Sequence, residues 1–206
     1  MLLRVCKAVG LLALAGCTFM EKRYILEPTL PNGERLSGRW SPTYQHALVI
    51  SYPGLDVEVA GQVQVIAQWV SPGPLPPLIP IPSDAWNHPR RVAIGISFFP
   101  YQKGYTFSPM RTRLQEDGVP VVQAEKWHGP QGFAVRRDNG PLPAQSEDNE
   151  VSIDSPMYIG IVFPVLAPLE GRAEVHFEGL RRHGIPVAFP VVPFWPKYQI
   201  TGGSVP

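Results

Sequence analysis

The sequence predicts an all-β protein, built as an antiparallel two-sheet β-sandwich. Its apolar residues recur with a period of two, which is typical of half-buried strands. The 206 residues include 25 prolines and 19 glycines. Together these make about 21 % of the chain, against an average usage of roughly 12 %, and such a density of helix-breaking residues leaves little room for helices. After Cys17, the longest stretch without either is residues 144–155, which has no apolar stripe. An immunoglobulin-like topology is expected, with a small β-barrel as the alternative.

Alternation is clearest in residues 62–69, 91–99 and 172–178, where apolar side chains are expected to face inward. The inward sets are Val63, Val65, Ala67 and Trp69; Val92, Ile94, Ile96 and Phe98; and Ala173, Val175 and Phe177. Further strands are expected at residues 45–51, 55–59, 110–115, 119–124, 157–163 and 185–192, with a hairpin turning at Asp117-Gly118.

Prolines define two unusual segments. Residues 71–82 hold six prolines in twelve positions and are expected to form a stiff crossover between the sheets, or alternatively a docking segment for a partner. Pro186, Pro190, Pro193 and Pro196 predict that the last strand region lies at an edge, because proline has no N–H to donate to a ladder.

The N-terminus carries the most specific pattern. Residues 1–7 are basic, with Arg4 and Lys7, and residues 8–14 are apolar but too short to span a bilayer. They lead into Leu14-Ala15-Gly16-Cys17. This run resembles the lipobox of bacterial lipoproteins. The alternative is an ordinary secretory signal that ends in a chance cysteine.

The resemblance implies a covalent anchor at Cys17. In that family the cysteine thiol is alkylated with diacylglycerol, cleavage follows before the cysteine, and the new amino group is commonly acylated. Cleavage would fall between Gly16 and Cys17. The second mature residue would be Thr18 rather than Asp, which by the same resemblance implies delivery to the outer membrane.

Three regions are therefore expected. Residues 1–16 are a cleaved signal peptide, residues 17–43 are the lipidated N-terminus and a tether, and residues 44–206 are one β-sandwich domain. The patch Tyr24-Ile25-Leu26 within the tether is apolar, and it either docks as an edge strand or remains part of the tether.

Charge and cysteine content exclude several function classes. The formal charge is +1, and it becomes −1 without residues 1–16, which hold two basic and no acidic residues. No nucleic-acid partner is expected from such a balance. The only other cysteine, Cys6, lies in the cleaved segment, so neither a catalytic cysteine nor a cysteine-ligated zinc is expected.

The search for metal and cofactor motifs predicts none. The five histidines have no short metal-type spacing and are interpreted as solvated surface residues: His46, His88, His128, His176 and His183. The series Asp148, Glu150, Ser152 and Asp154 begins like a calcium loop. Ile153 and Ile159 then occupy the positions of the required Gly and Glu, so a solvated acidic loop is expected.

Two residue classes leave a binding role open. The basic doublets are interpreted as solvated loop ends, or alternatively as contacts to headgroups or glycan phosphates: Arg90-Arg91, Arg136-Arg137 and Arg181-Arg182. Trp86, Trp127 and Trp195 either plug the sandwich ends or form a sugar or peptide platform.

The expected function is a lipid-anchored, periplasm-facing module without catalysis. It would bind or scaffold a protein or glycan partner in the envelope and use no cofactor. The alternative is an envelope hydrolase with catalytic residues on its loops.

Overall fold

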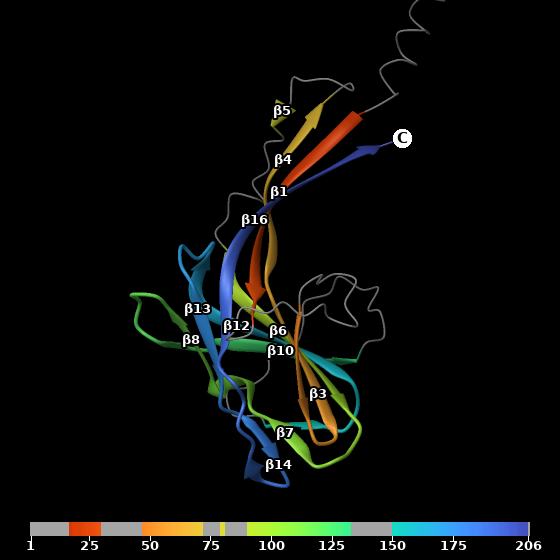
Figure 1. Ribbon diagram of the computed structural model, residues 1–206, viewed down its shortest axis with the longest axis vertical. Helices are drawn as coiled ribbons and strands as arrows, with labels where there is room; N and C mark the ends of the chain where they lie inside the picture. The colour runs from red at the N-terminus through yellow and green to blue at the C-terminus, as the bar shows by residue number, and fades with distance from the viewer. Residues whose placement is uncertain (1–16, 30–46, 72–78, 81–89, 133–149, 206) are drawn as a thin grey trace, which may run out of the picture. The chain divides into compact units, whose positions relative to one another are not determined.

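The fold was analysed in a computed structural model that describes residues 17–29, 47–71, 79–80, 90–132 and 150–205 (Figure 1). Within those ranges every regular element is a strand except one 3₁₀ turn, η1 (Pro109–Arg111). The strands are β1 (Cys17–Pro28), β2 (Ala47–Tyr52), β3 (Leu55–Gly61), β4 (Val63–Ser71), β5 (Ile79–Pro80), β6 (Arg90–Pro100), β7 (Tyr105–Phe107), β8 (Thr112–Glu116), β9 (Val122–Gln123), β10 (Lys126–Gly132), β11 (Val151–Ile153), β12 (Met157–Ala167), β13 (Ala173–Phe177), β14 (Leu180–Arg182), β15 (Ile185–Pro186) and β16 (Val192–Val205).

The chain divides into two compact units that share β1 and β16. Among the described residues, the first unit holds 17–25, 63–71, 79–80 and 198–205. The second unit holds 26–29, 47–62, 90–132 and 150–197. The sequence does not predict two units built from interleaved segments, because no change in composition marks residue 25 or residue 198.

The second unit contains a curled five-stranded sheet in the order β10-β12-β6-β3-β2 (Figure 1). All neighbouring strands in this sheet pair antiparallel. Strand β6 has the predicted alternation, since its four inward residues have no exposed surface: Val92, Ile94, Ile96 and Phe98. Neighbouring strands supply equally buried partners, Val57 and Val59 from β3 and Ile159 and Ile161 from β12. These rows of side chains on neighbouring strands form part of the apolar core of this unit.

Two further groups of strands complete the second unit. Strands β16, β13, β8 and β9 are consecutive neighbours in one sheet, and β11, β7, β14 and β15 form another. In β13, Ala173, Val175 and Phe177 are buried, as predicted. The predicted hairpin joins β8 to β9, with Gly118 at a φ of 78° in its turn.

The all-β class is therefore confirmed. In the part of the chain that the structure describes, three antiparallel sheets form a sandwich- or barrel-like fold. The immunoglobulin-like topology, the finer part of the prediction, remains a prediction.

In the first unit the strand order is β5-β4-β1-β16. Strand β1 pairs antiparallel with β4 from Thr18 opposite Ser71 to Ile25 opposite Val63. The Tyr24-Ile25-Leu26 patch thus docks, but in an interior strand rather than at an edge. Residues 17–28 are sheet and not tether, because neighbours on both sides satisfy their backbone groups. The rest of the expected tether, from residue 30, lies outside the described residues.

The predicted proline-rich edge is only partly correct. Pro186 lies in β15, the last strand of its sheet, but Pro193 and Pro196 lie in β16, between β1 and β13. The carbonyl of Pro193 accepts a hydrogen bond from the Thr29 amide at 2.8 Å. Strand β13 pairs with β16 over only three residues, and Glu174 is opposite Pro193. A proline is tolerated there because the short β13 ladder does not need its missing N–H.

The predicted faces of β4 are also wrong at one end. Gln64 is buried and Val63 is 37 % exposed, the reverse of the expected alternation. The pairing register shifts between Lys22 and Arg23, so that Ala67 is opposite Lys22 but Val65 is opposite Arg23. One extra residue in β4 inverts which side chains face inward beyond the bulge.

The proline-rich segment 71–82 lies mostly outside the described residues. Its described part, Ile79–Pro80, forms β5 and pairs with Trp69 and Val70 of β4. Among the described residues, no helix is long and apolar enough to cross a membrane.

Candidate functional site

Cys17, the predicted lipidation site, is the first residue of β1. The next residue, Thr18, is already paired with Ser71 of β4. In the first unit β16 runs opposite to β1, so the end of the chain lies at the same end of this sheet as Cys17 (Figure 1). The candidate site is therefore the Cys17 end of a sheet and not a loose segment.

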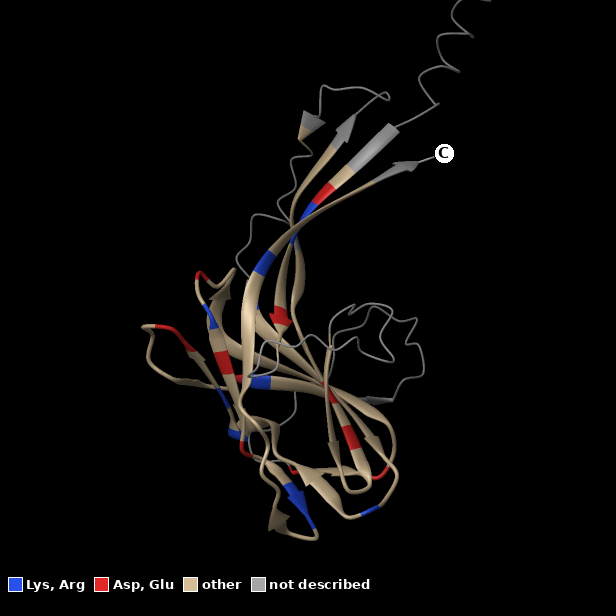
Figure 2. Cartoon of the chain, in the orientation of Figure 1, with Lys and Arg blue, Asp and Glu red and all other residues tan. Residues whose placement is uncertain are grey.

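Three consecutive residues carry the charges that the described part of the first unit contains: Glu21, Lys22 and Arg23. Figure 2 shows them as one short coloured band on β1. The Glu21 carboxylate accepts hydrogen bonds from Arg23 Nε at 2.7 Å and from Gln68 Nε2 at 2.9 Å. Lys22 Nζ lies 5.0 Å from the centre of the Tyr198 ring. Each of the three charges therefore has a partner within the same sheet.

Aromatic side chains flank this band. Tyr24 is fully buried, and its ring centre lies 5.9 Å from that of Tyr198, which is 51 % exposed. Ile200, two residues further along β16, is 62 % exposed. The sequence reasoning missed this cluster. Residues 18–27 contain no Gly or Pro, a signal that could have predicted the strand.

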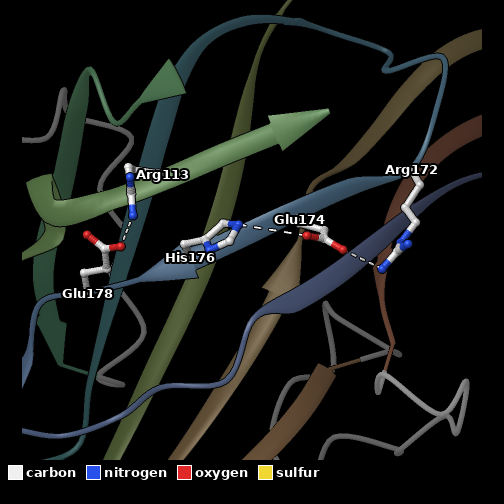
Figure 3. A network of polar contacts seen from close by, with 5 residues as sticks. All are labelled: Arg113, Arg172, Glu174, His176 and Glu178. Carbon is white, nitrogen blue, oxygen red and sulfur yellow. Dashed lines mark hydrogen bonds and ion pairs between the residues drawn. The ribbon is translucent and has the colours of Figure 1, made fainter. Parts of the chain in front are cut away.

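A second polar group lies on β13 and β8 of the second unit (Figure 3). Arg172 donates to Glu174 at 2.6 Å, and His176 Nε2 lies 4.0 Å from the other oxygen of Glu174. Arg113 forms an ion pair with Glu178. The 4.0 Å gap is too long for the hydrogen bond of a proton relay. These residues form a partly exposed row of charge pairs, in which the Nε2 atom of His176 is buried.

The other predicted histidines lie apart from this row. His128 is partly buried on β10, and burial lowers its pKa below 6.5, with a smaller contribution from Lys126. His183 is exposed in the turn after β14 at a φ of 50°. His46 and His88 lie outside the described residues.

The acidic series is only partly a loop: Ser152 lies in β11, which pairs with β7, whereas Glu150 and Asp154 flank this strand, and all three residues are exposed. Thr106 donates to the Glu150 carboxylate, and Ser152 Oγ donates to Asp154 at 2.7 Å. Asp148 lies outside the described residues. Within the described ranges, no three His, Cys, Asp or Glu residues converge to hold a metal ion.

The tryptophans and the basic doublets differ in their surroundings. Trp127 is buried on β10, as a packing role requires, whereas Trp195 is 51 % exposed on β16. Arg91 pairs with Glu125, and the Arg182 guanidinium lies 5.3 Å from the Tyr105 ring centre. Arg181 lies 4.0 Å from Glu150. Trp86, Arg136 and Arg137 lie outside the described residues, and nothing is described of the Arg90 side chain.

Comparison with known proteins finds no match: no family model fits the chain, and no curated protein or solved structure resembles it. The class that the fold defines is an all-β protein of sandwich- or barrel-like architecture.

Proposed function

We propose that the protein is a lipid-anchored envelope module that faces the periplasm from the outer membrane. The observation that carries the proposal is Leu14-Ala15-Gly16-Cys17 after a basic start and a seven-residue apolar stretch. Diacylglycerol on the Cys17 thiol, with an acylated amino group, supplies two or three chains. One chain binds a bilayer reversibly, whereas two or more hold firmly, because each buried methylene contributes about 0.8 kcal/mol.

The position of Cys17 supports this anchor. A lipidated residue at the start of β1 would transmit any pull on the anchor directly to a strand that is paired with β4 and β16. The ladder hydrogen bonds of a strand share such a load, whereas a loose terminus would not connect the anchor to the fold.

The proposed role of the body is binding or scaffolding rather than catalysis. The charged side chains of Figure 3 form ion pairs with one another on the surface of the sheet, which supports a structural rather than a catalytic role for them. Several large apolar side chains of the second unit face solvent, among them Tyr101 at 71 %, Ile185 at 69 % and Leu166 at 57 % exposure. Side chains of this kind suit contact with a protein or glycan partner.

The anchor is tested by replacing residues 1–17 with an ordinary cleavable signal peptide and fractionating the cells. We expect the exchanged protein in the soluble periplasm and the native protein in membranes with lipid on Cys17 by mass spectrometry. Cys17→Ser is a weaker test, because an uncleaved signal can itself hold the precursor. Sedimentation of the exchanged protein with membranes after a high-salt wash would reject the anchor.

The binding role is tested by crosslinking in intact cells and mass spectrometry of the captured species. Ile185→Asp and Leu166→Asp are the variants expected to reduce capture of a specific partner, with Val119→Asp as an exposed control. Hydrolysis of an envelope polymer by the purified protein would instead favour the enzyme alternative.

A further inference from the structure

The end of the first-unit sheet that carries Cys17 is free of charge. No Asp, Glu, Lys or Arg occurs in residues 17–20, 63–71, 79–80 or 198–205, which are all of the unit's described residues outside 21–25. The composition near Cys17 is instead apolar or uncharged, with Phe19, Met20, Trp69 and Ile200. A water-exposed sheet of this size normally carries charged residues along its whole length.

Pairing and chain direction place these residues toward the Cys17 end of the sheet. Met20 is opposite Trp69, and Trp69 is opposite Pro80. Tyr198 lies against Lys22 and Tyr24, and β16 runs opposite to β1, so Ile200 lies nearer the Cys17 end than Tyr198 (Figure 1). We call residues 17–20, 69–71, 79–80 and 200–205 the Cys17 end.

The spacing from Cys17 to the first charge is short. At a strand rise of about 3.3 Å per residue, Glu21 lies about 13 Å from Cys17 along β1. Elements that lie in the bilayer interface bury their apolar side about 5–10 Å deep. Because β1 begins at Cys17 itself, a lipid on that residue leaves no spacer to lift the sheet clear of the membrane.

We propose that the Cys17 end lies within the phospholipid headgroup layer, so that the sheet itself contacts the lipid surface. This inference rests on the proposed lipidation of Cys17. The layer extends to the band of Glu21, Lys22 and Arg23, where charge first appears. The sheet is not expected to enter the hydrocarbon core, because β5 is the edge of this sheet in the part of the chain that the structure describes, and hydrocarbon cannot satisfy the backbone groups of an open edge.

The side chains at this boundary suit an interface. Lys22 lies over the exposed Tyr198 ring, and Tyr24 packs behind it. Tyrosine and tryptophan favour the headgroup level, and lysine can extend its ammonium to water while its stem stays on apolar surface. Arg23 and Glu21 neutralise each other on the same strand. The band therefore marks where the sheet leaves the lipid surface.

The test uses single cysteines, since the mature chain has no thiol other than Cys17. Ile200→Cys and Val63→Cys carry an environment-sensitive fluorophore on the lipidated full chain, reconstituted in vesicles with a headgroup-nitroxide phospholipid. Both positions are exposed, at 62 % and 37 %. Val63, opposite Ile25, is the matched control, about 26 Å along β4 from Ser71. We expect quenching at position 200 to exceed that at position 63 by about threefold or more.

Equal quenching at both positions, in protein that floats with the vesicles and carries lipid by mass, would overturn this inference and leave the anchor intact. Protein without lipid on Cys17 would instead reject the proposed function. Thr201→Cys repeats the measurement on the other face of β16, so an unfolded Ile200 variant does not leave the question open. Strong quenching at either position 200 or position 201, with weak quenching at 63, supports the inference.

Discussion

The two units of this chain are stabilised in different ways. Among the residues whose side chains the structure describes, the second unit buries rows of apolar side chains from β3, β6, β12 and β13, whereas the first unit buries Tyr24, Ile25 and Gln64 and no others. The second unit carries paired charges on its surface, and the first has a single charged band. A sheet that buries many apolar side chains is stabilised in water by that burial. A sheet that buries few depends instead on the hydrogen bonds between its strands and on contacts with its surroundings.

The largest effect should come from the core of the second unit. Phe107 has no exposed surface and packs against Phe98 and Phe177, with ring centres at 5.2 and 6.5 Å. We expect Phe107→Ala to lower the free energy of unfolding by about 3–5 kcal/mol, measured by urea denaturation. Ile185→Ala, at an exposed site, is the control. A loss below about 1 kcal/mol would remove the contrast between the units.

A smaller effect is expected in the first unit. Tyr198→Ala removes the ring contact with Tyr24 and the cation–π contact with Lys22. We expect a local loss of about 1 kcal/mol, visible as faster amide exchange in β1 and β16. Unchanged amides in β6 serve as the internal control. Equal acceleration throughout both units would show that they unfold as one.

The pH response tests a partly buried group of the second unit. Burial lowers the pKa of His128, so the unfolded chain binds its proton more readily than the folded protein. Its contribution to stability is complete above the unfolded pKa of 6.5 and is lost as pH falls through the lowered folded pKa. In His128→Gln the free energy of unfolding should fall less steeply from about pH 7 to pH 5. An unchanged slope would contradict the prediction.

The smallest effect should come from the surface charges. Arg113 and Glu178 are 44 % and 52 % exposed, and exposed pairs contribute at most about 1 kcal/mol. A double-mutant cycle of Arg113→Ala and Glu178→Ala should give a coupling near about 0.5 kcal/mol that disappears in high salt. A coupling of several kcal/mol would mean that this row has a role beyond surface pairing.

Alternation predicted the strands whose faces differ in polarity. Strands β6 and β13 follow it at every inward position, because one side faces the core and the other does not. Alternation does not predict the three-residue strands β7, β11 and β14, since so few residues cannot show a period. It also does not predict β10, which contains Gly129 and Pro130, and of the predicted strand 185–192 only residues 185–186 and 192 are strand.

The remaining differences have physical causes outside local sequence. Gln64 is buried because a bulge between its segment and Trp69 shifts the register, and a bulge leaves no mark in the alternation itself. The composition of residues 17–43 predicts a tether, and the partners that make residues 17–28 a strand, β4 and β16, lie in other parts of the sequence. The lipid anchor at Cys17 rests on a motif alone and remains a prediction.

The position of β16 has a consequence for the timing of folding. Thr29 and Pro193, which share a hydrogen bond, are 164 residues apart, and β16 is the neighbour of both β1 and β13. Contacts this distant form late, since a long loop must close first. The side of β1 that faces β16 therefore stays unpaired until nearly the whole chain has been made, although β4 can pair with its other side much earlier. During that interval the backbone groups on this side of β1 are exposed to strands of other chains, so a chaperone that binds the incomplete chain would protect this side of the strand.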